Sequence, residues 1–353
     1  MAKKRKTLVD NLQEIIDSGN LDAFRAVFDK CEINATNRGA TTCNALSYRN
    51  LTPEHIQFLI ENGLDVNADC GWGYSAVGLQ AGNKENLKCL LEHGADIDCI
   101  IKEYRGSALS RACSCLDVEA VKNLLEQNAS IDVKCDLDQK PLLDAVLAHC
   151  DNAYIVNALE ISKMLIAAGA FKSEKTKEYV HRIGERFEFF RADFNKESVD
   201  RYSDALDELY KIFDVVPVPR RKIHDGTSII SIKATTWQKQ HEELWNMLVP
   251  GKGKAQTVQG EMIRIVGKVL HEILDSGGIN WDEDHQKMLR ILHTFLQTGS
   301  GMESELVEEA CNLTKRISPR SDKKELYRLN ELVVQWVMAN PKPVKLGDVD
   351  YDR

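Results

Sequence analysis

The first half of the chain repeats one pattern of apolar and polar positions. Each copy has two or three apolar residues, a short polar link, Gly or Asn, and then a small or apolar residue. Four stretches carry this pattern: FLIENGLDVNAD (58–69), CLLEHGADIDCI (89–100), NLLEQNASIDVK (123–134) and MLIAAGAFKSEK (164–175). Their Gly or Asn positions are Gly63, Gly94, Asn128 and Gly169. Because Gly adopts a left-handed backbone freely and Asn tolerates it, each helix is predicted to end there in a sharp turn.

The spacing of these copies indicates a repeat protein. Ile33, Val66, Ile97 and Ile131 occupy matching positions and are separated by 33, 31 and 34 residues. A period near 33 is typical of a unit made of two antiparallel helices and a turn. One such unit cannot bury its own apolar face, whereas several stacked units share a continuous core. A degenerate earlier copy, AVFDKCEINA (26–35), extends the array towards the amino terminus.

The segment GSALSRACSCLDVEAVKNLLEQNASID (106–132) resembles the ankyrin-repeat family. The family pattern is matched at Leu109, Ala112, Glu119, Val121, Leu124 and Leu125, whereas Ser107, Ala108 and Ser110 replace its Thr, Pro and His. The next unit begins at KPLLDAV (140–146), and extra residues around 149–157 predict a longer helix there. The resemblance covers residues 7–172 and implies an all-α ankyrin-repeat solenoid of about five units with degenerate caps.

The ankyrin resemblance also implies a function, because members of this family mostly bind other proteins through their finger-like turns and concave face. Carried over by position, the partner-binding residues are Arg38, Asp69, Trp72, Tyr74, Lys102, Tyr104, Arg105, Asp136 and Asp138. Trp, Tyr and Arg supply much of the anchoring energy at protein interfaces. The alternative is that Trp72 and Tyr104 pack between neighbouring turns, since Gly71 and Gly73 would let Trp72 fold back.

After residue 172 the Gly-terminated period is lost. Residues 173–214 are predicted to form capping helices, and the prolines of VVPVP make 215–236 a linker or extended arm. One short strand near 227–235 is the alternative within this segment. Residues 237–340 predict a small bundle of about five amphipathic helices. The two ends are interpreted as a disordered basic terminus (1–6) and a flexible tail (341–353).

The charge of the chain narrows the class of partner. The chain has 46 basic and 54 acidic residues, a formal net charge of −8. Residues 7–172 hold 14 basic and 24 acidic side chains, a net charge of −10. An acidic body repels phosphate backbones and favours a basic protein partner. The sharper form of this hypothesis is an inhibitor, such as an immunity protein or antitoxin, that neutralises a basic toxin.

Two features of the second half bear on partners. Residues 215–300 are similar to a module of uncharacterised bacterial proteins, which implies a bacterial or phage origin and no particular activity. The bundle would hold a second protein or form a homodimer. Nucleic-acid binding is the weaker alternative, and it would use the basic side chains of Arg220, Arg221, Lys222, Lys252 and Lys254.

Catalytic motifs are incomplete in this sequence. HEELW (241–245) and HEILD (271–275) each lack the second His of the zinc-protease motif HExxH. GKGKAQT (251–257) lacks the phosphate-loop spacing, although a Gly- and Lys-rich turn before a helix can hold an anion. Glu261, Arg264 and His271 are weak catalytic candidates, since a carboxylate and an imidazole in one cleft allow acid–base chemistry. The competing hypothesis is therefore an enzyme or a nucleotide or ligand sensor within 237–300, targeted by the array.

The remaining expectations concern cofactors and location. Ten cysteines without CxxC spacing indicate buried thiols in a reducing compartment, and neither a metal nor a cofactor is expected. No apolar run reaches the length of a membrane span. We therefore expect a cytoplasmic, non-enzymatic scaffold or adaptor that binds a protein partner and no membrane.

Overall fold

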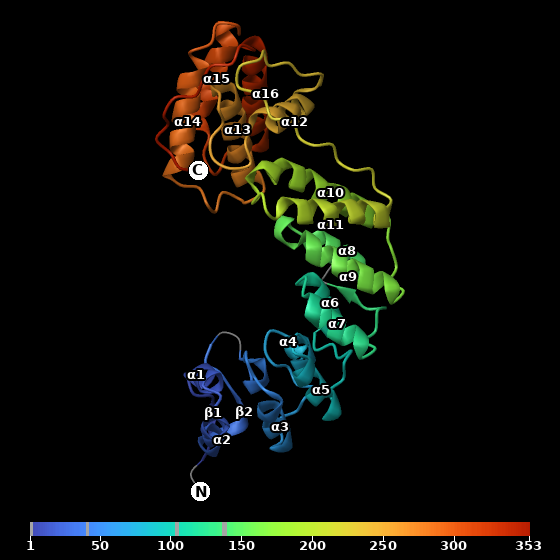
Figure 1. Cartoon of the computed structure of the whole chain (residues 1–353). Helices are drawn as coiled ribbons and strands as arrows, with labels where there is room; N and C mark the ends of the chain where they lie inside the picture. Colours follow the sequence, from blue (N-terminus) through green and yellow to red (C-terminus); the bar gives the residue numbers. More distant parts are fainter. Residues whose placement is uncertain (1–2, 40–41, 103–105, 136–139) are drawn as a thin grey trace. The chain divides into compact units, whose positions relative to one another are not determined.

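The structure is a computed structural model that describes residues 3–39, 42–102, 106–135 and 140–353 (Figure 1). It separates into two compact units, each described here by itself. The amino-terminal unit comprises Met1–Arg186 and Lys196–Pro217, and the carboxy-terminal unit comprises Phe187–Asn195 and Val218–Arg353. The described residues form sixteen α-helices and four short strands, which confirms the predicted all-α class.

The chain begins with a strand where disorder was predicted. β1 (Arg5–Thr7) pairs in parallel with β2 (Cys31–Thr36), and α1 (Leu12–Asp17) and α2 (Leu21–Lys30) connect them. Lys4 adds a hydrogen bond of 2.6 Å from Nζ to the carbonyl oxygen of Phe28. The interpretation of residues 1–6 as disordered is wrong for the residues described, because a partner strand far along the sequence satisfies their backbone groups.

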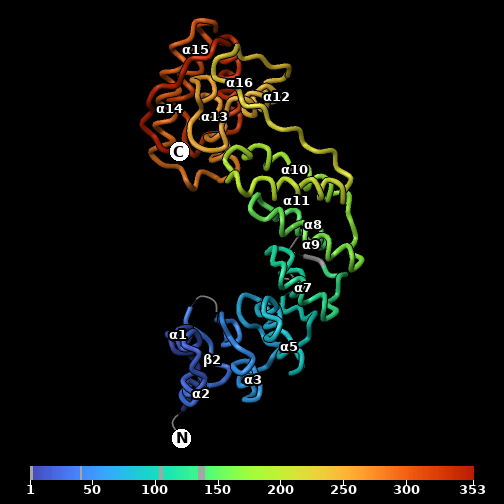
Figure 2. Tube along the Cα trace, in the orientation of Figure 1, coloured from blue at the N-terminus to red at the C-terminus, as the bar shows by residue number. Residues whose placement is uncertain are grey.

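Helix pairs follow one another along the rest of the amino-terminal unit (Figure 2). The short helix Ala45–Ser47 precedes α3 (Pro53–Glu61), α4 (Ala76–Gln80) precedes α5 (Lys84–Glu92), α6 (Ala108–Ser114) precedes α7 (Val118–Glu126), and α8 (Leu142–His149) precedes α9 (Ile155–Ala167). The antiparallel strands β3 (Lys134–Cys135) and β4 (Lys140–Pro141) lie between α7 and α8. With 13 residues, α9 is longer than the nine-residue α7, as the extra residues predicted.

The predicted helix ends are confirmed. Gly63, Gly94, Asn128 and Gly169 have φ of 97°, 85°, 60° and 95°, all in the left-handed region. At each of them the following residue donates its N–H back into the last helical turn, as Ala95 does to the carbonyl oxygen of Leu90 at 3.0 Å. The reversed backbone therefore satisfies carbonyl groups that the end of the helix would leave unpaired.

Buried asparagines link successive units of the array, a feature that the periodicity did not reveal. Nδ2 of Asn86 donates to the carbonyl oxygen of Leu51 at 2.8 Å, and Nδ2 of Asn123 donates to that of Ala81 at 2.9 Å. Both side chains are at most 4% exposed. Each bond ties one unit to the unit before it, so the stack is held by specific polar contacts as well as by its apolar core.

Two longer helices follow the array. α10 (Lys175–Phe190) enters the carboxy-terminal unit with its last turn, and α11 (Val199–Phe213) packs against α9 within the amino-terminal unit. An ion pair between Lys163 of α9 and Glu208 of α11 lies at the edge of this packing. The apolar face of α11 provides the buried side chains Leu206, Leu209 and Phe213.

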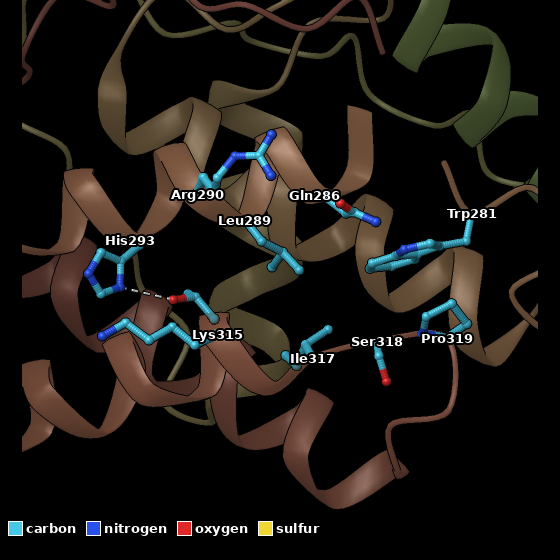
Figure 3. Close-up of a pocket in the computed structure, with 10 residues that line it drawn as sticks. Trp281, Gln286, Leu289, Arg290, His293, Lys315, Ile317, Ser318 and Pro319 are labelled. Carbon is cyan, nitrogen blue, oxygen red and sulfur yellow. Dashed lines mark hydrogen bonds between the residues drawn. The ribbon is translucent and has the colours of Figure 1, made fainter. Parts of the chain in front are cut away.

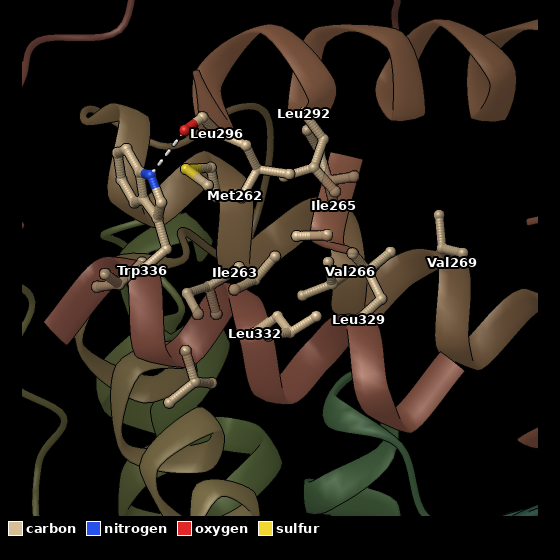
Figure 4. Packing of buried hydrophobic residues seen from close by; sticks show 14 of the residues in the cluster. Met262, Ile263, Ile265, Val266, Val269, Leu292, Leu296, Leu329, Leu332 and Trp336 are labelled. Atoms are coloured by element: carbon tan, nitrogen blue, oxygen red, sulfur yellow. Dashed lines mark hydrogen bonds between the residues drawn. The ribbon is translucent and has the colours of Figure 1, made fainter. Parts of the chain in front are cut away.

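Five helices build the carboxy-terminal unit: α12 (Trp237–Leu248), α13 (Val258–Leu274), α14 (Glu283–Leu296), α15 (Ser304–Arg316) and α16 (Lys323–Ala339). α13 is buried by its neighbours, and Met262, Ile265 and Val269 pack against side chains of α14 and α16 (Figure 4). Trp336 closes one end of this core, where its Nε1 donates to the carbonyl oxygen of Leu296 at 3.0 Å.

Two segments of this unit bear on the prediction: the first follows the extended-arm alternative, and the second contradicts the predicted tail. Residues 227–235 form no strand; their extended backbone is held where the N–H of Ile230 donates to the carbonyl oxygen of Pro341 at 2.9 Å. Residues 341–353 are not a flexible tail. They run along α13, with the N–H of Val258 donating to Val344 and that of Leu346 donating to Gln256, and Tyr351 is only 2% exposed. Sequence polarity hid these contacts, since main-chain groups make most of them.

Candidate functional site

The turn between residues 69 and 74 is built around one aspartate. Oδ1 of Asp69 accepts hydrogen bonds from the N–H groups of Gly71 (2.8 Å) and Gly73 (3.0 Å). The N–H of Cys70 donates to the carbonyl oxygen of Tyr74 at 2.9 Å and closes the turn. Gly71 and Gly73 have φ of 114° and 78°, and a Cβ on Gly71 would lie 2.3 Å from Sγ of Cys43. The DCGWGY sequence therefore specifies a tight, rigid turn.

Trp72 stands at the apex of this turn. Its φ is 63°, a left-handed conformation that costs a non-glycine residue about 1–2 kcal/mol. The side chain is 58% exposed, so the indole does not fold back between neighbouring turns. The turn thus holds a large aromatic side chain in solvent at an energetic cost to the fold.

The structure brings Asp69 and Lys102 together, whereas it uses Tyr74 for packing. Nζ of Lys102 lies 3.9 Å from Oδ2 of Asp69, which joins two successive turns of the array. The guanidinium of Arg111 lies 5.0 Å from the ring centroid of Tyr74, and its Nη1 donates to the carbonyl oxygen of Gly78. Asp69 and Tyr74 therefore shape the surface on which Trp72 stands.

Ile100 is a second exposed apolar side chain, and the sequence reasoning missed it. It is 49% exposed and belongs to the same turn as Lys102, next to the turn of Trp72. An isoleucine at a turn position between Asp98 and Lys102 was the available signal. Of the other predicted contacts, Arg38 is exposed, and Tyr104, Arg105, Asp136 and Asp138 lie outside the described residues.

The weak catalytic candidates are divided between two environments. Glu261 is fully buried and accepts hydrogen bonds from Nε of Arg264 (2.8 Å), the N–H of Ala255 (2.9 Å) and the hydroxyl of Tyr351 (2.5 Å). Burial acts to raise the pKa of Glu261, but the hydrogen bonds and charge of Arg264 outweigh it and lower the pKa below its usual value. A carboxylate that stays ionised and has these donors around it is suited to holding structure, not to moving protons.

His271 belongs to the surface. Its ring is 70% exposed, and Nδ1 lies 2.7 Å from Oδ2 of Asp275 one helical turn away. Arg264 and His271 line a common cavity of about 590 Å³, while the Glu261 carboxylate binds Tyr351 and Ala255. The three candidates therefore do not form an acid–base pair around one substrate position.

A second cavity, of about 580 Å³, lies between α14 and the end of α15 (Figure 3). His293 of α14 faces Lys315 of α15, Arg290 also lines the cavity, and Trp281 lies beside Pro319 at one end. Nδ1 of His293 is 3.2 Å from Oγ1 of Thr314, so this nitrogen is already hydrogen-bonded within the protein. Since Arg290 and Lys315 are solvent-exposed, this cavity is a surface groove with solvated charges.

In the part of the chain that the structure describes, no three His, Cys, Asp or Glu side chains lie close enough to hold a metal ion. Burial raises the pKa of the Cys70 and Cys150 thiols to about 12, which makes them poor nucleophiles at neutral pH. None of the helices formed by the described residues combines the length and apolar content that a membrane-spanning segment needs.

Comparison with known proteins identifies the middle part of the array. A family model described as ankyrin repeats, in three copies, matches residues 43–135. No curated protein matches the chain. The matched range contains the left-handed helix ends at Gly63, Gly94 and Asn128 and the turn that carries Trp72. Ankyrin repeats are protein-interaction modules and typically have no catalytic activity, so this part of the chain is a protein–protein interaction domain. Residues 43–135 are ankyrin repeats.

Proposed function

We propose that the chain is a non-enzymatic adaptor whose ankyrin array binds a basic protein, with Trp72 as its anchor. The observation that carries the proposal is the 58% exposure of Trp72 on a rigid turn. A large aromatic residue that is already ordered loses little conformational freedom when a partner covers it, so most of its burial contributes to affinity.

Ile100 extends the anchor to the next turn. The ion pair between Asp69 and Lys102 joins the two turns, which supports a common apolar contact made by Trp72 and Ile100. The charged pair of Asp69 and Lys102 lies beside this contact, as charged groups do at the rim of many protein interfaces. Trp72 would therefore enter an apolar pocket of the partner, and polar groups of the partner would lie around it.

The charge of the array supports the choice of a basic partner. Residues 7–172 have a net charge of −10, which would speed encounter with a positively charged protein and disfavour nucleic acid. An inhibitor of a basic toxin, acting as an immunity protein or antitoxin in the cytoplasm, is the most specific form of this proposal. The interface would then cover the toxin's basic substrate-binding surface.

The test is affinity capture with the full chain from a lysate of the organism that encodes it. We expect a stoichiometric protein partner of basic isoelectric point, released as salt is raised, and a loss of at least tenfold in capture with Trp72→Ala. Tyr154→Ala is the matched control, because Tyr154 is an exposed aromatic residue (45%) elsewhere in the same unit. Equal capture by wild type and Trp72→Ala would overturn the proposal.

A further inference from the structure

The cavity lined by Arg264 and His271 has an aromatic wall. Phe189 and Trp245 lie nearly parallel, with ring centroids 6.3 Å apart and planes 16° apart, and both rings line the cavity. His241 also stacks on Trp245, with ring centroids 6.0 Å apart. Aromatic surfaces of this kind are typical of sites for flat ligands.

Two basic side chains of α13 lie next to that wall. A Cβ on Gly267 would lie 2.4 Å from Cζ3 of Trp245, so the indole lies directly on the backbone of α13 at this residue. Arg264 and Lys268 are one helical turn apart on either side of Gly267, and both line the cavity. The aromatic and basic parts of the site are therefore adjacent.

Two basic side chains of the cavity have hydrogen-bond donors that find no partner among the described residues. Arg264 is 1% exposed, and within the described chain its Nη1 has no hydrogen-bond partner. Lys268 is half-buried and makes neither a hydrogen bond nor an ion pair with any residue that the structure describes. Burial, and then the charge of Arg264, lower the pKa of Lys268. A buried donor without a partner costs about 1–3 kcal/mol, and more when it is charged.

The carboxylates in and beside this cavity already have partners. The Glu272 carboxylate accepts the N–H of Asn280 at 2.7 Å, and Arg353 is bound to Asp282 at 2.8 Å. Both carboxylate oxygens of Glu261, which lies beside the cavity, accept hydrogen bonds from Arg264, Ala255 and Tyr351. The cationic groups Arg264 and Lys268 therefore have hydrogen-bonding capacity to spare while the carboxylates do not, and the group that would complete the cavity is an anion.

We propose that this cavity binds a small nucleotide, with its phosphate at Arg264 and Lys268 and its base against Trp245 and Phe189. The volume of about 590 Å³ lies within the roughly 300–1,000 Å³ of ligand pockets. Gly251 and Gly253 line the same cavity, which assigns the Gly- and Lys-rich turn to the site. This binding function is separate from partner capture by the array and does not depend on it.

Isothermal titration of the full chain with AMP tests this site, with adenosine and inorganic phosphate as the two halves of the ligand. We expect AMP to bind more tightly than either half, and Lys268→Gln to weaken it about tenfold or more, as loss of a charged hydrogen bond does. Lys268→Gln leaves no bonded group behind, so the unit should stay folded, as circular dichroism would show. Lys239→Gln is the control, because Lys239 is exposed on α12 and does not line the cavity.

Each other outcome counts against the proposal. Phosphate that binds as tightly as AMP would show an anion site without a place for the base. Adenosine that binds as tightly as AMP would remove the role of Arg264 and Lys268. An absence of heat with AMP, or affinity unchanged in Lys268→Gln, would overturn the site altogether.

Discussion

The two units of this protein are held together in different ways. In the array, the contacts that define the fold connect a unit to its neighbour, as Asn123 does with Ala81. In the carboxy-terminal unit, a central ion pair depends on a residue far along the chain, since Tyr351 donates to Glu261 across 90 positions. Regular local contacts tolerate divergence of sequence, whereas a long-range buried network makes the fold depend on a few residues.

The largest effect should come from breaking the buried ion pair. Arg264→Met would leave the Glu261 carboxylate fully buried without its cation, and should destabilise the carboxy-terminal unit by about 3–5 kcal/mol. Urea unfolding followed by hydrogen exchange would report each unit separately. The array should exchange as in the wild type, because none of its helix ends depends on Arg264.

A matched variant separates charge from packing. Glu261→Leu, Arg264→Met and Tyr351→Phe combined leave no buried charge or hydroxyl without a partner, and only the N–H of Ala255 loses its acceptor, so part of the stability should return. Acid makes the same comparison without mutation. Because the folded pKa of Glu261 is lowered, its contribution is lost as pH falls from the ordinary value of 4.5 through the folded pKa. If Arg264→Met alone were as stable as the wild type, the assigned role of the ion pair would be contradicted.

The second prediction concerns residues 341–353. Tyr351→Ala should cost about 3 kcal/mol, since the buried ring leaves a cavity as well as an unpaired Glu261 oxygen. Tyr351→Phe keeps the ring and should cost about 1–2 kcal/mol. The free energy of unfolding of the carboxy-terminal unit measures both. If neither change alters it, the segment is the flexible tail that the sequence predicted.

The same contrast explains how much the sequence could predict. Gly63, Gly94 and Asn128 predicted the helix ends, because a left-handed backbone restricts which residue types can occupy those positions. The helices of the bundle were found by their apolar faces, and the five of them lie within the predicted range 237–340. The asparagine hydrogen bonds between units, the packing of residues 341–353 and the aromatic wall of the proposed nucleotide cavity were not found, although a ligand sensor within 237–300 and an anion at 251–257 were among the alternatives. Their contacts join positions whose separation carries no periodic signal.

Candidate sites followed the same rule. Trp72 was found because an aromatic residue between two glycines in a turn is visible in the sequence. Arg264 was found as a weak catalytic candidate together with Glu261, which lies three positions away, whereas Tyr351, 90 positions from Glu261, was not. Lys268 carried no signal at all, because its unpaired state depends on which side chains surround it in space.

A smaller effect should follow from the helix ends of the array. A Cβ on Gly94 would have no atom within 4 Å, so Gly94→Ala introduces backbone strain alone and should cost about 1–2 kcal/mol. Asn128→Gly should change stability by less than about 1 kcal/mol, since glycine adopts the same φ without strain. Chemical denaturation of the full chain, followed by hydrogen exchange in peptides from the array, gives both free-energy changes. A neutral Gly94→Ala would show that the turn can relax.

The smallest expected effect on stability is the most informative about function. Trp72 has a left-handed φ of 63° and is 58% exposed, so the fold gains little burial from a side chain that strains its backbone. In Trp72→Gly, relief of that strain and the greater freedom of the unfolded chain nearly cancel, and the array should keep its stability within about 0.5 kcal/mol. Thermal unfolding of the array would show this, while capture of the partner should fall at least tenfold. Strain without a structural return is expected where a residue contacts a partner. A large loss of stability in Trp72→Gly would instead mean that the indole supports the turn, and the anchor would then have to be sought at Ile100.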